Sequence, residues 1–188
     1  MARVREGLLL ALLLAPVAAP AVEVGQVAPA LTVPSIDARQ MISLSDYRGK
    51  VVYLDFWSSW CTPCRRAMPE LSSLRDQLSR DDFEVVAVNV DPVKEDVRRF
   101  LAQVSVSYPV GVDVTARSAG TFQVTTFPAA FLIDREGIVQ HVYQGAADVR
   151  AIGEQVRRLV DGLPQRRALC VARSPVLDSP SCEGSPGS

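Results

Sequence analysis

Two cysteines in the chain are spaced for redox chemistry, in the sequence Trp-Cys-Thr-Pro-Cys at positions 60–64. An apolar strand pattern at 51–56 precedes them, and a helical pattern covers 61–78, so Cys61 is predicted to lie where a strand passes into a helix. The unpaired N–H groups and the positive dipole end of a helix N-terminus stabilise a thiolate over a thiol. We therefore predict that Cys61 is the exposed, attacking thiol and that Cys64, one helical turn further on, is the resolving thiol.

A permanent structural disulfide and half of a zinc site are the alternative interpretations of this pair. Zinc requires four ligands, and the other candidates in the chain are Cys170, Cys182 and the single histidine, His141. The predicted position between strand and helix is the one that a reactive dithiol needs. It favours redox catalysis without a bound metal or cofactor.

Motifs on both sides of the dithiol resemble a known superfamily. Asp55-Phe56-Trp57 and Pro69, together with the dithiol, resemble the active-site strand and helix of the thioredoxin superfamily. Thr126-Phe127-Pro128 and the apolar run at 130–134 resemble its cis-proline loop and following strand. The resemblance covers most of the chain from about residue 28 to 160, and within the superfamily the chain is most similar to the extracytoplasmic TlpA, ResA and CcmG group of thiol-disulfide oxidoreductases.

This resemblance implies a thioredoxin-like α/β fold with a central mixed sheet and helices on both faces. Two additions are typical of the group: an N-terminal β-hairpin, at 31–44, and an inserted helix and strand, at 92–103 and 108–112. The remaining pattern predicts strands at 51–56 and 83–90, a short helix at 115–122, an antiparallel hairpin at 129–134 and 138–143, and a closing helix at 148–160.

Asp55 lies six residues before Cys61, where thioredoxin has its buried aspartate. Its apolar neighbours predict burial, which raises the pKa of a carboxyl group. We predict that Asp55 exchanges a proton with Cys64 during catalysis, the alternative being an exposed acid on a strand. Members of the group often carry a glutamate three residues after the second cysteine, but Ala67 stands there in this chain, so that role is not transferred.

The resemblance also implies a surface that binds substrate. Pro128 corresponds to the cis-proline that faces the dithiol, and Phe127 then presents its backbone to an extended substrate segment, which pairs with it as an added strand. Trp60 is expected to pack beside the dithiol and shape this surface. An ordinary trans-proline at the start of a strand is the alternative for Pro128.

Both ends of the chain differ in composition from its middle. Residues 1–21 carry arginines, a short leucine-rich stretch and an Ala-Pro-Ala site, which predict a secretory signal peptide, with an uncleaved membrane anchor as the alternative. Residues 22–163 form the predicted domain, and the Ser, Pro and Gly-rich segment 164–188 is a predicted flexible tail. In this tail, pairing of Cys170 with Cys182 is one option beside free thiols or intermolecular links.

Export fits a protein that exchanges disulfides in a periplasmic or otherwise exported compartment, where a reactive dithiol needs a partner such as a membrane electron donor. The net charge of −1 and the absence of a basic run in the sequence argue against a nucleic-acid partner. The expected activity is protein-disulfide reduction with a cytochrome c maturation or metal-site assembly partner, although the direction of electron flow stays open.

Two other activities remain as alternatives. A peroxiredoxin-like peroxidase requires Pro-x-x-x-Thr-x-x-Cys, which neither Cys61 nor Cys64 matches. A copper-binding thiol chaperone requires cysteines separated by three residues and a distal histidine, whereas the separation here is two residues.

Overall fold

A mixed sheet of five strands, in the order β5-β4-β3-β6-β7, forms the centre of the computed structural model, which describes residues 22–146 and 148–162. Its strands are β3 (Val51–Trp57), β4 (Phe83–Asn89), β5 (Val110–Val112), β6 (Ala129–Ile133) and β7 (Val139–Gln144). The other elements are β1 (Thr32–Pro34), β2 (Met41–Ser43), the 3-10 helix η1 (Leu44–Tyr47), α1 (Thr62–Asp76), α2 (Lys94–Leu101), α3 (Arg117–Thr121) and α4 (Val149–Val160). The predicted α/β fold is confirmed, and the ends of these helices and strands differ from the expected ones by about two residues or fewer.

Strand β3 lies in the middle of the sheet, with every residue buried. It runs parallel to β4 and antiparallel to β6. Because side chains alternate along a strand, Tyr53 and Trp57 join one apolar cluster while Leu54 and Phe56 join another on the opposite face. A strand covered on both faces explains the uninterrupted apolar pattern of its sequence.

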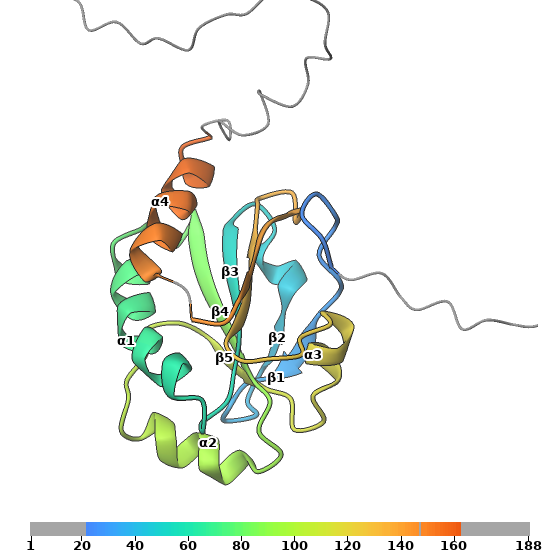
Figure 1. Ribbon diagram of the computed structural model, residues 1–188, viewed down its shortest axis with the longest axis vertical. Helices are drawn as coiled ribbons and strands as arrows, with labels where there is room; N and C mark the ends of the chain where they lie inside the picture. Colours follow the sequence, from blue (N-terminus) through green and yellow to red (C-terminus); the bar gives the residue numbers. More distant parts are fainter. Residues whose placement is uncertain (1–21, 147, 163–188) are drawn as a thin grey trace, which may run out of the picture.

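Helices cover both faces of the sheet, as predicted. Helices α1, α2 and α4 contribute buried side chains to the cluster around Tyr53 and Trp57. Helix α3 and the β1-β2 hairpin cover the other face, where Phe122 packs against Phe56 and Phe131. Figure 1 shows α1 and α4 on one side of the sheet and α3 with the hairpin on the other.

The two additions expected of the group are present. Strands β1 and β2 pair as an antiparallel hairpin, and α2 with β5 stands between β4 and α3. Gly111 of β5 lies directly beneath the hairpin, because a Cβ atom at this position would come within 2.4 Å of Val33 Cγ2. The hairpin therefore closes tightly over the edge of the sheet.

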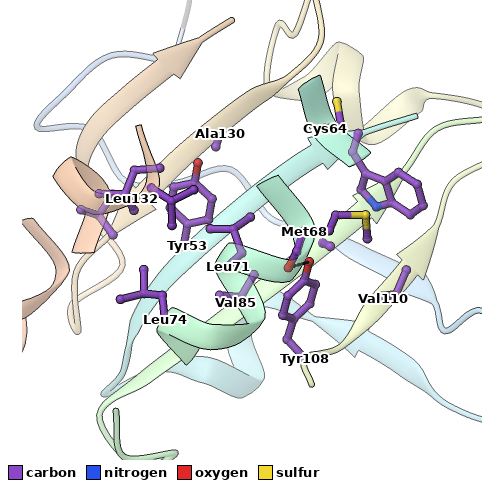
Figure 2. Close-up of a cluster of buried hydrophobic side chains, with 14 of the residues drawn as sticks. Tyr53, Cys64, Met68, Leu71, Leu74, Val85, Tyr108, Val110, Ala130 and Leu132 are labelled. Carbon is purple, nitrogen blue, oxygen red and sulfur yellow. Dashed lines mark hydrogen bonds between the residues drawn. The ribbon is translucent and has the colours of Figure 1, made fainter. Parts of the chain in front are cut away.

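Helix α1 presents an apolar side to the sheet through Met68, Leu71 and Leu74. Figure 2 shows Cys64, Met68, Leu71 and Leu74 of α1 among the buried side chains Tyr53, Val85, Ala130 and Leu132 of the sheet. Near its C-terminal end, α1 also buries a charge, since Arg75 Nε donates to Glu84 Oε1 of β4 at 2.6 Å. The helix that carries the dithiol is thus attached to the sheet by apolar packing and by a buried ion pair.

Several predictions fall on other parts of the chain. The signal peptide at 1–21 and the tail at 164–188, with Cys170 and Cys182, lie outside the described residues. Within residues 22–146 and 148–162, no helix combines the length and the apolar character needed to cross a bilayer. The domain limits at 22 and 163 stay predictions.

Candidate active site

The dithiol lies at the start of α1, directly after the loop that leaves β3. Cys61 and Cys64 form a disulfide with a Cα–Cα distance of 5.3 Å. Cys61 is the N-cap residue of α1, and its Sγ accepts a hydrogen bond from the backbone N–H of Cys64 at 3.3 Å. A helix N-terminus with a donor directed at this sulfur stabilises negative charge there once the disulfide is reduced.

Both sulfurs are buried in the disulfide form. Cys61 is 4% exposed and Cys64 2% exposed. The expectation that Cys61 is exposed is therefore wrong for this form, because each sulfur covers the other across the bond and both residues join the apolar cluster of α1. The neighbouring Trp60 is 69% exposed, and Thr62 and Pro63 between the two cysteines are exposed as well.

Asp55 is buried on β3, on the sheet face that α1 covers. Its cross-strand neighbours are Ala87 of β4 and Ala130 of β6, which place only methyl groups beside it. Burial raises the pKa of the Asp55 carboxyl to about 7. The predicted burial and direction of the shift are confirmed, and the carboxyl is able to gain or lose a proton near neutral pH.

A small cavity brings the sequence-predicted residues together. Asp55, Cys64, Ala67 and Pro128 line it, with Tyr143 among the other lining residues, and its volume of about 20 Å³ is enough for one water molecule. Ala67 keeps this space open, since a longer side chain at its position would fill it. Asp55 and Cys64 thus line the same small cavity.

The loop before β6 supplies the opposite wall of the site. The Phe127–Pro128 peptide bond is cis, as the resemblance implied. The ring of Phe127 contacts the exposed ring of Trp60 edge to face, with centroids 5.8 Å apart. The structure therefore joins Trp60 to the cis-proline loop, and Pro128 to the cavity next to Cys64.

A set of buried polar residues near the dithiol was missed in the sequence. Ser58, Asn89 and Asp91 are buried beneath the loop that leads to Cys61. The sequence did contain a signal for this cluster. Ser58 directly follows β3, and Asn89 ends β4 with Asp91 two residues further on. The carboxyl ends of neighbouring parallel strands lie together, which brings these side chains close.

Cations near the dithiol lie at the surface. Arg65 and Arg66 are exposed on α1, and the Arg65 guanidinium lies 5.0 Å from the centre of the Phe100 ring. Within the described part of the chain, no group of three or more His, Cys, Asp or Glu side chains is arranged to hold a metal ion.

The fold and the site together define a thioredoxin-like protein. Its redox-active cysteine pair lies beside a small cavity that the buried acid and the cis-proline also line. Residues 24–142 match the model of the AhpC/TSA family, so the chain belongs to that family.

Curated relatives carry the name thiol-disulfide oxidoreductase ResA. The chain is 31% identical to the Bacillus cereus protein over 144 residues, which cover 77% of this chain and 78% of the relative. It is 35% identical to the Geobacillus thermodenitrificans protein over 125 residues, or 66% and 71% of the two chains.

Solved structures agree. A crystal structure from Chlorobium tepidum, assigned as thiol:disulfide interchange protein DsbE, is 35% identical with a TM-score of 0.71, covering 74% of this chain and 99% of that one. The exposed lipoprotein thioredoxin Etrx1 of Streptococcus pneumoniae is 28% identical with a TM-score of 0.62, covering 70% and 100%. The protein is a thiol-disulfide oxidoreductase with a Cys61–Cys64 redox pair.

Proposed function

We propose that the protein reduces disulfides in other proteins, with Cys61 as the attacking thiol and Cys64 as the resolving thiol. The observation that carries this assignment is the Cys64 N–H directed at Cys61 Sγ at the helix N-terminus, which favours a thiolate at Cys61. The Cys61 thiolate attacks one sulfur of the substrate disulfide, forms a mixed disulfide and releases the other substrate sulfur as a thiolate.

Asp55 acts in the second step. Its carboxylate takes the proton of the Cys64 thiol, and the resulting thiolate attacks Cys61 Sγ, closes the Cys61–Cys64 disulfide and releases the second substrate sulfur. Two electrons pass from the dithiol to the substrate. The shared cavity and the pKa of Asp55 near 7 support this role, because a base with a pKa near ambient pH both accepts and returns the proton.

Trp60, Phe127 and Pro128 form the substrate-binding surface in this proposal. The exposed Trp60 ring and its contact with Phe127 support it, since an exposed aromatic pair beside a reactive bond offers apolar area to a partner. An extended substrate segment pairs with the backbone at Phe127 as an added strand.

The proposed setting is outside the cytoplasm, with a cytochrome c maturation or metal-site assembly protein as substrate and a membrane protein as electron donor. The signal pattern of residues 1–21 supports export. The names of the relatives, ResA and DsbE, and the lipoprotein assignment of Etrx1 are consistent with a related role. Fractionation of cells that express the full chain tests the location, and recovery in the cytosol alone contradicts it.

The experiment that tests the mechanism is a trap. With Cys64→Ser, the mixed disulfide at Cys61 cannot resolve, so substrate proteins stay attached and are identified after non-reducing electrophoresis. Cys61→Ser is the matched control and should trap nothing. If Cys64→Ser also captures no protein, or if the reduced wild type consumes peroxide and leaves protein disulfides intact, disulfide reduction is not the activity.

A further inference from the structure

Buried polar side chains lie beneath the loop between β3 and α1. We call Ser58, Asn89 and Asp91 the buried polar cluster; Ser58 and Asn89 are fully buried and Asp91 is 3% exposed. Their hydrogen bonds run to one another and to the backbone of Ser59, and the proton transfer described above does not use them. Because buried polar groups in folded proteins are hydrogen-bonded, the partners of these side chains show which parts of the chain they hold together.

The Asp91 carboxylate holds the loop through hydrogen bonds. Its Oδ1 accepts from the Ser58 hydroxyl, and its Oδ2 accepts from the Ser59 N–H at 2.9 Å and from Asn89 Nδ2 at 3.1 Å. Asn89 Oδ1 in turn accepts the Asp91 N–H at 2.9 Å, which fixes the orientation of the amide. The end of β4 is thereby tied to the two residues that follow β3.

The same loop sets the position of the reactive sulfur. The Ser58 carbonyl accepts the N–H of Cys61 at 3.1 Å, so the residue that Asp91 holds by its side chain also holds Cys61 by its backbone. Cys61 Sγ then receives the N–H of Cys64 at 3.3 Å. A continuous series of hydrogen bonds leads from the Asp91 carboxylate to the start of α1.

We propose that Asp91 is a positioning residue for the reactive thiol, holding Ser58 and Ser59 so that Cys61 keeps the helix N-terminus donors that stabilise its thiolate. A buried carboxylate that loses its donors is strongly destabilised, so loop conformations that break these bonds are disfavoured. Although burial alone opposes ionisation, the hydrogen bonds from Ser58, Ser59 and Asn89 hold the pKa of Asp91 below its ordinary value, and the group stays ionised. The inference rests on the proposed role of Cys61 as attacking thiol.

The test uses Asp91→Ala and Asp91→Asn in the full chain. In the reduced proteins, the thiolate absorbance at 240 nm against pH gives the pKa of the Cys61 thiol, and iodoacetamide labelling followed by mass spectrometry gives the rate and the site of alkylation. For Asp91→Ala we expect a thiol pKa about one unit higher and, at pH 7, alkylation of Cys61 about tenfold slower. Asp91→Asn should shift both quantities in the same direction by less, because its amide oxygen still accepts some of these bonds.

Asp134→Ala is the matched control. The Asp134 carboxylate also accepts two backbone N–H groups and a side-chain amide, from Glu136, Ile138 and Gln140, but it follows β6 at the end of the sheet remote from the dithiol. This variant should lose stability without changing the pKa or the alkylation rate of Cys61. If Asp91→Ala does not fold, Ser58→Ala removes one of the donors and should slow alkylation about threefold, in line with a smaller rise of the thiol pKa.

The proposal and the proposed function fail in different ways. If Cys61 is alkylated first, at the same rate in the wild type and in the folded variants of Asp91 or Ser58, Asp91 has no positioning role and the proposed function stands. A lower thiol pKa in the Asp91 variants also overturns the inference, because the carboxylate would then act on Cys61 by charge repulsion. If the wild type is alkylated first at Cys64, the assignment of Cys61 as attacking thiol is wrong.

Discussion

Asp55 is an ionisable residue in a buried site that disfavours its charged form. It lies on the central strand between Ala87 and Ala130, and burial raises its pKa from its ordinary value of 3.8 to about 7. Such a group lowers the stability of the fold as the pH rises from its pKa in the unfolded state to its pKa in the folded state. Asp55 is therefore expected to destabilise the fold at neutral and alkaline pH.

Asp55→Asn tests this cost in the disulfide form, where the cysteines do not titrate. Below pH 3.8 Asp55 is protonated in both states; as pH rises, the unfolded state releases the proton first, so stability falls until the folded group ionises near pH 7. The variant lacks this loss, so its stability relative to wild type should rise by about 4 kcal/mol between pH 3 and pH 8. Urea unfolding at pH 3, 5, 7 and 8 measures it, and a difference between variant and wild type that is the same at every pH contradicts it.

The same substitution should slow disulfide exchange. Without the Asp55 carboxylate, the Cys64 thiol loses its proton acceptor, and the rate of resolution at pH 7 should fall by about 10- to 100-fold. Stopped-flow reduction of a protein disulfide from pH 5 to 9 gives the rate and its profile. Glu70→Gln, an exposed acid on α1, is the control and should leave both unchanged; an unchanged rate and profile in Asp55→Asn shows that Asp55 does not accept the proton of Cys64.

At the scale of elements, the helix that bears the dithiol is attached to the sheet at both ends. Its N-terminal end is held through the Ser58 carbonyl and the Cys61 N–H, and its C-terminal end by Arg75 and Glu84. Both side chains of this ion pair are buried: that of Arg75 is 1% exposed and that of Glu84 is 7% exposed. A rigid helix keeps the sulfurs in register with the cis-proline loop.

The substitution Arg75→Ala should therefore destabilise the folded protein. It leaves Glu84 buried without its close partner, and we expect a loss of about 3 to 5 kcal/mol in the free energy of unfolding. The control is Arg98→Ala on α2, whose ion pair with Glu95 is exposed and should contribute less than about 1 kcal/mol. Urea unfolding at pH 7 compares them, and equal losses in the two variants would show that burial of the Arg75 pair has no special weight.

At the scale of the whole molecule, the proposed docking surface is assembled from distant segments. Trp60 comes from the loop after β3 and Phe127 from the loop before β6, and their rings meet next to the dithiol. An exposed apolar pair of this kind adds little to folding but offers area to a partner. Its contribution should appear in substrate binding.

Trp60→Ala should raise KM for a protein disulfide by about tenfold, the effect of losing about 1.4 kcal/mol of binding, while a small disulfide reagent is reduced nearly as before. The thermal midpoint should stay within about 2 °C of wild type because the side chain is exposed. Steady-state reduction of insulin and of a small disulfide compares the two substrates. Met41→Ala, an exposed apolar residue on the β1-β2 hairpin, is the control; an equal change of KM in both variants removes Trp60 from the docking surface.

Much of the fold was accessible from the sequence because its signals are local. The strand and helix patterns around Cys61 depend on neighbours within one or two turns, and the glycine turn at Gly137, with φ 82°, needs only its own residue. The dithiol chemistry follows from the same short range, since a helix N-terminus acts on the residue that caps it. Asp55 and Pro128 were identified through the resemblance that their flanking residues carry.

Only the tertiary structure decided how these residues meet. The cavity shared by Asp55, Cys64 and Pro128 is lined by residues of β3, α1, β6, β7 and α4, and the pairing of β3 with β6 sets Asp55 opposite Ala130. The burial of Cys61 depends on tertiary packing in the same way. The Arg75–Glu84 pair and the hydrogen bonds of Asp91 join residues that lie apart along the chain, so the sequence did not reveal these contacts. The sequence by itself determined which groups could exchange electrons; side-chain packing and strand register determined which acid and which buried polar groups lie beside them.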